Sequence, residues 1–295
     1  MNMRIAAGQA GFELETRLFP FGPKASVIAT VQFQPGTKQA DPLSPALGKR
    51  CVNRRPYRGE NLPVQAREEL LALVNSEPGA SLDLIEDSHR KRALAALAAR
   101  NDQILFENRA LHDGLYRWLR WTAQETGLTG DGLPVESLEL NPFERPGFRW
   151  MGSWKFAHAL AAAGVTRILP GRSRRVYERS AAIGLLSISG ARPKDFVRGG
   201  ELLERFWLTA TLKGIAFQPI TGITFLLERC RALGGEGLSE AHRRILEGIR
   251  RHLVRLLPAA ERKTPLMLFR LGYADAPTGR TRRRPTEAAF TVKSP

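Results

Sequence analysis

The sequence predicts an α+β fold in which a central sheet is covered by helices. Three observations lead to this prediction. Segments with the two-residue alternation of strands are mixed along the chain with segments of helical periodicity. The 295 residues, 43% of them hydrophobic and 25% charged, are enough to build a substantial core of ordinary composition. No run of roughly 18 apolar residues is present, so no membrane-spanning helix is expected.

The expected strands are short segments in which apolar residues alternate with polar ones or form a continuous apolar run. Proline and glycine stand near their ends. They cover residues 12–20, 26–35, 81–87, 183–189 and 265–273. The continuous apolar run at 183–189 predicts a buried strand.

Helices are expected where apolar residues recur at three- and four-residue spacing. They cover residues 44–53, 62–74, 88–121, 194–213 and 239–257, with a break in the third near residues 112–114. Ser44 followed by Pro45 is a favourable helix start, and Pro56 lies where that helix must end. Gly214 can close the 194–213 helix in the left-handed conformation. The side chains expected to face the core are Leu70, Leu71, Leu73, Ile245, Ile249 and Leu253.

The stretch 127–154 interrupts this regularity with glycines, prolines and aromatic residues. A loop of this length inside a compact domain is usually functional, and its aromatic content indicates packing against another surface. We interpret it as a flap over a pocket. A domain-swapped or dimer-wrapping arm is the alternative.

A net charge of +16 and a pI near 10.8 predict an anionic partner. The basic residues are scattered, apart from a cluster at 280–284, and lack an interleaved aromatic platform or a zinc or helix-turn-helix signature. No specific nucleic-acid partner is therefore expected. Cys51 and Cys230 lie far apart, and the first residues lack the apolar core of a signal peptide, so the cytoplasm is the expected compartment.

The most informative feature is the pair Arg50 and Arg54 in the segment KRCVNRRPY. Four residues apart in the expected helix, they would project from one face. Two guanidinium groups facing the same way suit a phosphate or two carboxylates, because their fork geometry pairs bidentately with such oxygens. A solvated basic face is the alternative. We expect Glu201 and Glu204 to pair with nearby basic residues.

Other signatures of catalysis are missing from the sequence. It contains no Gly-x-Ser-x-Gly elbow, Walker A loop, His-Glu-x-x-His or Cys-x-x-Cys motif. The five histidines stand in separate segments. No metal site and no catalytic acid or base is therefore assigned.

The arginine segment resembles the R-x-[ST]-x-[RK] element of the FMN-dependent nitroreductase family, with Val52 where that family has Ser or Thr. The resemblance implies that Arg50, Val52 and Arg54 lie at the flavin phosphate. Residues 199–220 resemble the family's helix and following turn, which implies that the turn's residues flank the flavin ring; in this chain they are Pro219, Ile220 and Thr221. Residues 270–273 and 282–285 resemble its closing strand and a phosphate-contacting arginine, which is Arg283 here, with Arg282 and Arg284 beside it.

The fit is best with the Acg-like branch, in which two nitroreductase-like halves are fused and imitate a dimer. This implies that residues 1–46 are the remnant of a first half and that 47–295 form the second, with the flap at 127–154. The Pro-Ser…Asn-x-Gln-Pro-Trp motif of that first half is absent from the sequence, so the chain is expected to lack an N-terminal segment.

The implied function is an FMN-dependent oxidoreductase that passes electrons from NAD(P)H to nitroaromatic or quinone-like acceptors. The alternative is a flavin-binding or flavin-sequestering protein without turnover. A monomeric pseudo-dimer and a homodimer are both expected forms, with no membrane partner.

Overall fold

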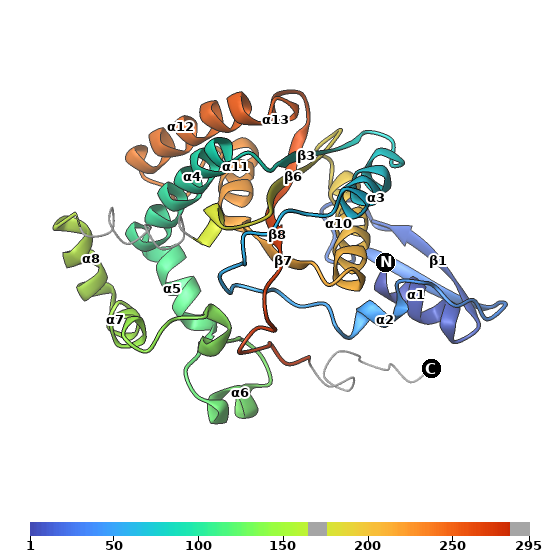
Figure 1. The fold of residues 1–295 in the computed structure, drawn as a ribbon. Helices are drawn as coiled ribbons and strands as arrows, with labels where there is room; N and C mark the ends of the chain where they lie inside the picture. The colour runs from blue at the N-terminus through green and yellow to red at the C-terminus, as the bar shows by residue number, and fades with distance from the viewer. Residues whose placement is uncertain (165–175, 284–295) are drawn as a thin grey trace.

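The computed structural model describes residues 1–164 and 176–283, and its centre is a four-stranded antiparallel sheet (Figure 1). The strands lie in the order β3 (Ala80–Ile85), β6 (Ala182–Ile188), β8 (Thr264–Gly272) and β7 (Ala216–Pro219). Each neighbouring pair is antiparallel. Every residue of β6 is buried, as the apolar run predicts. The predicted α+β fold with a helix-covered sheet is confirmed.

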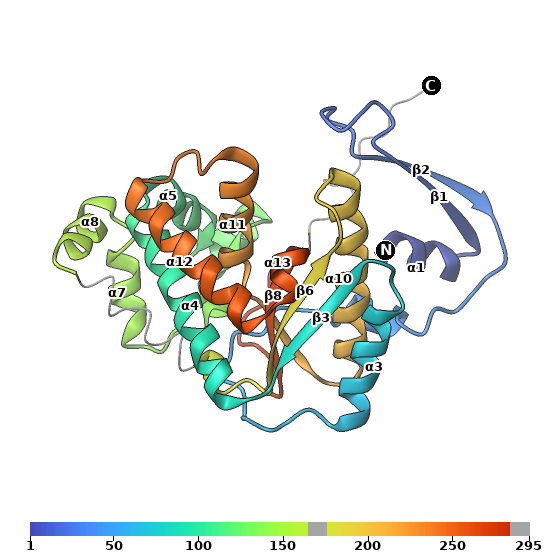
Figure 2. The same ribbon diagram turned by 90° about the horizontal axis from the view of Figure 1, so that it is seen from above.

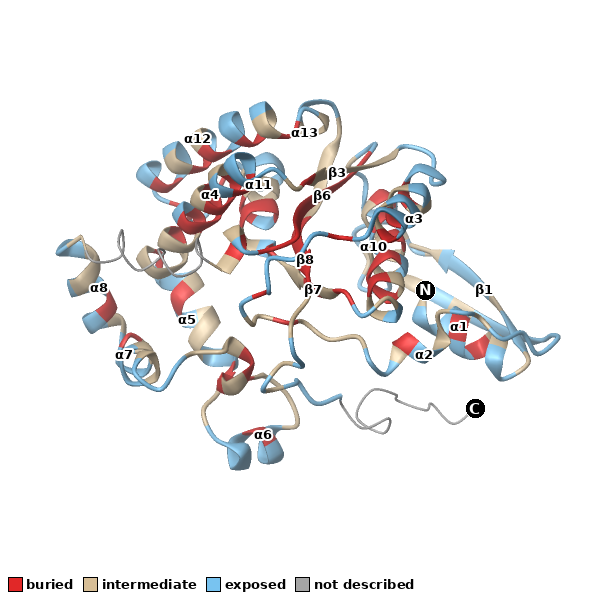
Figure 3. Cartoon of the chain, in the orientation of Figure 1, coloured by how far each residue is buried: buried red, intermediate tan, exposed pale blue. Residues whose placement is uncertain are grey.

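Helices pack on both faces of this sheet (Figure 2). One layer consists of α3 (Val64–Asn75) and α10 (Pro193–Leu212). The other contains α4 (Ser88–Glu107), α11 (Thr221–Leu233) and α12 (Glu240–Leu256), followed by the short α13 (Ala259–Arg262). Buried residues are concentrated on the central strands and on the inward faces of the helices (Figure 3).

An aromatic stack anchors the first layer to the sheet. The Phe217 ring on β7 stacks on Trp207 of α10, with ring centroids 4.4 Å apart, and on Phe269 of β8 at 4.8 Å. Phe206 lies 5.1 Å from Phe269 on the same side. These rings are at most 8% exposed, and aromatic side chains of this size dominate the burial energy of a core.

Two excursions leave this body on opposite sides (Figure 1). The N-terminal excursion consists of α1 (Asn2–Gln9), the hairpin of β1 (Phe12–Leu18) and β2 (Ala29–Pro35), and α2 (Ser44–Leu47). The second consists of α5 (Arg109–Trp118), β4 (Leu119–Arg120), α6 (Ala123–Thr129), β5 (Leu133–Pro134), the 3-10 helix η1 (Val135–Leu138), α7 (Glu144–Trp150) and α8 (Trp154–Ala162). No helix of residues 1–164 or 176–283 combines the length and apolarity needed to cross a bilayer.

All five predicted strands are present within a few residues of their expected bounds, as are the helices at 62–74, 194–213 and 239–257. Gly214 follows α10 with a φ of +68°, as predicted. Leu70, Ile249 and Leu253 are buried, whereas Leu71, Leu73 and Ile245 are half-buried. Helix α11 was not expected from the sequence.

The predicted helix over residues 44–53 is wrong beyond Leu47, where α2 ends. The backbone N–H of Asn53 donates to the carbonyl of Phe217 on β7 at 3.0 Å. Because this tertiary hydrogen bond uses the N–H that a longer helix would need, the chain leaves the helix and runs along the sheet edge. Local propensity is overridden by the sheet.

The break in the 88–121 helix falls at Asn108, not near residues 112–114. The Asn108 side chain accepts a hydrogen bond from the N–H of Leu111 at 3.1 Å and donates to the carbonyl of Gly237 at 2.7 Å. It therefore caps α5 and ties it to the loop before α12. The stretch 127–154, expected as one long loop, contains β5, η1 and α7.

Two glycine replacements test this packing with opposite signs. A Cβ on Gly184 of β6 would lie 2.5 Å from the Phe269 ring, so Gly184→Ala is expected to destabilise the fold by about 1–3 kcal/mol. A Cβ on Gly114 in α5 would meet nothing within 4 Å, so Gly114→Ala is expected to stabilise it by up to about 1 kcal/mol. Urea unfolding of both variants measures the difference. Equal effects would contradict the described packing around β6.

Candidate functional site

The segment between α2 and α3 lies against β7, the edge strand of the sheet, and against the chain that follows β8. Besides the bond to Phe217, the Asn53 amide donates to the carbonyl of Asp275 at 2.8 Å. The N–H of Arg58 donates to the carbonyl of Tyr273 at 2.9 Å. The arginine-containing segment is thus held between two parts of the chain that are far away in sequence.

A buried arginine, Arg270, holds the arginine-containing segment against the sheet. Arg270 on β8 is fully buried, and its guanidinium donates to the Gln218 side-chain oxygen at 2.6 Å. It also donates to the carbonyls of Arg55 at 2.8 Å and Asn53 at 3.4 Å. Its guanidinium carbon lies 3.7 Å from the centre of the Tyr57 ring. Burial lowers the pKa of Arg270, because the charged form loses its hydration.

The two predicted phosphate arginines point to different elements. The Arg50 Nε lies 2.9 Å from a Glu204 carboxylate oxygen on α10, and its guanidinium lies 4.5 Å from the Trp207 ring centre. Arg54 donates instead to the carbonyl of Ser137 in η1 at 3.3 Å, and burial lowers its pKa. The expectation of one shared helical face is wrong, because the helix ends before either residue.

Glu201 and Glu204 do pair with basic groups, as expected. Glu204 pairs with Arg50, and Glu201 lies 3.3 Å from the amino group of Met1 and 3.7 Å from the Arg4 guanidinium. The N-terminal excursion is therefore attached to α10 by charges as well as by apolar contact.

Arg283 returns to the neighbourhood of Arg50. Its guanidinium donates to the carbonyl of Leu47 at 2.6 Å, and the N–H of Arg50 donates to the carbonyl of Ala46 at 2.9 Å. The Arg283 guanidinium and the Arg50 backbone therefore both bond to the end of α2, while the Arg50 side chain is directed to Glu204 on α10. Val52 is half-buried and packs against the aromatic cluster of the first layer. Arg284 lies outside the described residues.

The turn from β7 into α11 contains the predicted ring-flanking residues. Pro219 ends β7, and Ile220 is 6% exposed and donates its N–H to the carbonyl of Leu268 at 2.7 Å. Thr221 is exposed and begins α11. The first turn of a helix presents N–H groups without intrahelical partners and carries a partial positive charge. This turn can therefore receive electron-rich atoms.

Two residues beside this turn were missed by the sequence reasoning. Gly222 lies so close to the Asn101 amide that a Cβ there would overlap the amide nitrogen. Asn101 on α4 is 4% exposed, and its side-chain oxygen has no hydrogen-bond partner. Buried polar atoms without a hydrogen-bond partner are uncommon in proteins, and this oxygen can accept a hydrogen bond from a bound group. The sequence feature that could have pointed to this site is Asn101, an asparagine in the Ala-rich helix α4.

The cysteines and acidic residues add no further chemistry to this region. Cys51 and Cys230 are free thiols. Within the described part of the chain, no group of three or more His, Cys, Asp or Glu side chains could hold a metal ion. Cavities lie between α11 and α12 and beside α7 and α8, and neither of these is lined by Arg50, Arg54, Arg283 or the 219–221 turn.

No protein-family model matches the chain, and a curated protein of similar sequence is found. The uncharacterized protein MT1398 of Mycobacterium tuberculosis (strain CDC 1551 / Oshkosh) is 26% identical over 289 residues. The match covers 96% of this chain but only 39% of that protein. The chain therefore spans well under half the length of this relative.

Several solved structures are similar in overall arrangement. A nitroreductase with bound FMN from Bacteroides fragilis gives a TM-score of 0.45 at 11% identity, over 86% of this chain and 100% of that one. NfnB from Mycobacterium smegmatis, an FMN-dependent nitroreductase in complex with NADPH, gives a TM-score of 0.47 at 16% identity, over 84% of this chain and 96% of that one. Iodotyrosine deiodinase bound to FMN and 3-iodo-L-tyrosine gives a TM-score of 0.43 at 12% identity, over 85% of this chain and 97% of that one.

The buried tyrosine beneath the arginine segment makes stability depend on alkaline pH. Burial raises the pKa of Tyr57 to about 12, and its hydroxyl donates to the carbonyl of Asn53 at 3.0 Å. Because the folded pKa lies above the unfolded value of about 10, its stabilisation is complete below pH 10 and is lost as the pH rises toward 12. Raising the pKa of Tyr57 from about 10 to about 12 corresponds to about 3 kcal/mol in the free energy of unfolding.

The test compares the free energy of unfolding in urea at pH 8, 10, 11 and 12. Tyr57→Phe is expected to cost about 1 kcal/mol at pH 8 through the lost hydrogen bond, and its stability should fall less steeply than that of the parent above pH 10. Parallel pH profiles for the two proteins would show that Tyr57 does not carry this dependence.

Proposed function

We propose that this chain is an FMN-dependent oxidoreductase of nitroreductase type, which passes electrons from NAD(P)H to nitroaromatic or quinone-like acceptors. One observation carries the proposal. The segment that contains Arg50 and Arg54 is hydrogen-bonded through Asn53 to β7, the strand that ends in Pro219, Ile220 and Thr221. The basic groups and the start of α11 thus belong to one edge of the sheet.

The residues present fit the two ends of the cofactor. Arg50 and Arg283, which both bond to carbonyls at the end of α2, would hold the phosphate, with the Arg50 guanidinium exchanging its Glu204 partner for a phosphate oxygen. Guanidinium groups form charge-assisted hydrogen bonds with phosphate oxygens. Arg54 would add positive charge, and Val52 an apolar wall. At the other end, the N–H groups of the first turn of α11 would face electron-rich ring atoms.

The unpaired oxygen of Asn101 is a third point of fit, because it can accept a hydrogen bond from a ring N–H beside Gly222. The flavin, when bound, supplies the electron and hydride transfer itself. This chain's residues anchor, orient and electrostatically favour the cofactor, and no protein acid or base is assigned.

The proposal extends to the setting of the protein. Residues 1–46 would be the remnant of a first nitroreductase-like half of the Acg-like type, and 47–295 the half that carries the site, with 127–154 as its flap. The partner would be a small-molecule electron acceptor in the cytoplasm, without a specific nucleic-acid or membrane partner. The chain would act as a monomeric pseudo-dimer or as a homodimer.

Comparison of FMN with riboflavin tests the phosphate contact directly, because the two differ only in the phosphate. If Arg283 holds the phosphate, Arg283→Ala should weaken the affinity for FMN about tenfold or more and leave the affinity for riboflavin unchanged. Flavin fluorescence quenching measures both dissociation constants. Arg282→Ala is the matched control, because Arg282 is the exposed neighbour with no partner among the described residues. Equal affinity of the parent for the two flavins would remove the phosphate-site assignment.

Turnover separates the proposed oxidoreductase from a flavin-sequestering protein. With FMN bound, the chain is expected to oxidise NADPH in the presence of a nitroaromatic compound, measured as a loss of absorbance at the NADPH band. Tight FMN binding without NADPH oxidation would favour the sequestering function.

A further inference from the structure

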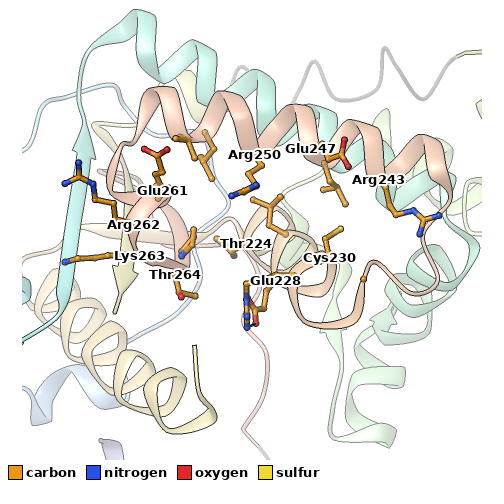
Figure 4. A pocket seen from close by; sticks show the side chains of 18 of the residues that line it. Thr224, Glu228, Cys230, Arg243, Glu247, Arg250, Glu261, Arg262, Lys263 and Thr264 are labelled. Carbon is orange, nitrogen blue, oxygen red and sulfur yellow. Dashed lines mark hydrogen bonds and ion pairs between the residues drawn. The ribbon is translucent and has the colours of Figure 1, made fainter. Parts of the chain in front are cut away.

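A cavity of about 610 Å³ lies between α11 and α12, and none of the residues assigned to the candidate flavin site lines it (Figure 4). Helix α13 and the first residues of β8 close one end of it. Its lining residues on α12 extend from Arg243 to Val254, which corresponds to about 16 Å along a helix axis. A volume of this size is typical of small-molecule sites, and the cavity is elongated.

The floor of this cavity is apolar. Leu227 of α11 and Val254 of α12 are the partly exposed apolar residues that line it, whereas Leu246 and Leu253 of α12 also line it but are each only 1% exposed. Thr224 adds little polarity, because its hydroxyl donates to the carbonyl of Thr221 one turn earlier. A ligand that fills the groove would therefore bury an apolar body against this floor.

The rim is charged, and several of its groups are already engaged. Glu228 pairs with Arg231 on α11 at 2.5 Å, and Lys263 donates to the carbonyl of Ala80 at 2.8 Å. In Figure 4 the Arg262 and Lys263 side chains extend sideways toward β3, whereas Arg250 projects toward the middle of the labelled side chains. Arg250 has no hydrogen-bond or ion-pair partner among the described residues.

We propose that this groove binds an elongated amphipathic carboxylate, with its apolar body along the floor and its carboxylate on Arg250. A single guanidinium pairs bidentately with one carboxylate, and Arg250 is the lining arginine that projects toward the middle of the labelled side chains in Figure 4. Arg243 lines the cavity two helical turns away on α12, about 10 Å along the helix axis, too far to share one anionic group. A doubly charged phosphate would need further cations, and Arg231, Arg262 and Lys263 are paired or turned away. The site is separate from the flavin proposal and does not depend on it.

The groove also borders the helix that begins the candidate site. Thr224 lines the cavity, and its hydroxyl is bonded to the residue that opens α11. An occupant of the groove would thus contact the helix whose first turn faces the proposed flavin ring. Binding itself, not this coupling, is what the following experiment measures.

Isothermal titration calorimetry with decanoate tests the proposal on the full chain. Decanoate is expected to bind one site per chain, and Arg250→Ala should weaken it at least about tenfold. Arg251→Ala is the matched control, because Arg251 is the next residue on the same helix, is exposed and does not line the cavity. The neutral 1-decanol, with the same apolar chain, should bind at least about tenfold more weakly than decanoate.

Three results would overturn the proposal. These are no saturable decanoate binding, an equal loss in the two arginine variants, and equal binding of decanoate and 1-decanol. The second would indicate general attraction of anions to a chain of net charge +16. Far-UV circular dichroism confirms that each variant is folded, and Arg250→Gln replaces the alanine variant if that one is not.

Discussion

A single buried arginine holds the candidate site to the sheet. Removing a guanidinium from water costs several kcal/mol unless its donors find acceptors, and Arg270 finds them in Gln218 and in the carbonyls of Asn53 and Arg55. The same bonds fix the backbone of the segment that contributes Arg50 and Arg54. The Tyr57 ring covers the Arg270 guanidinium, and the Tyr57 hydroxyl donates to the carbonyl of Asn53. The segment has no helix or strand of its own, so this network determines its path.

The position of that segment decides what the edge of the sheet can do. Because Asn53 is bonded to β7, the arginine segment lies against the strand that leads into the turn opening α11, and a helix start is itself weakly positive. Arg283, which follows β8, bonds to Leu47 at the start of the same segment. Together with the unpaired Asn101 oxygen, these groups are the ones that the proposed flavin would contact.

Sequence periodicity predicted β3, β6 and β8 of the sheet and helices α3, α4, α5, α10 and α12, because those segments bury a regular face against one core. It missed the short edge strand β7 and helix α11. It failed where one long-range hydrogen bond decides the local structure, as at Asn53 and Asn108. Arg283 and the 219–221 turn were reachable through the family resemblance. The contact of Gly222 with Asn101 joins residues far apart in sequence and leaves no local pattern. The burial of Arg270 was likewise beyond reach, since a charged residue at a strand end is expected to face solvent.

The most direct measurement is the visible spectrum of this chain after incubation with excess FMN and removal of unbound flavin. The account predicts a yellow protein with the bands of oxidised flavin, at one FMN per chain, because the arginine segment, the α11 turn and Asn101 are all provided by the described residues. A folded but colourless protein would contradict the assignment of a flavin site to this edge of the sheet.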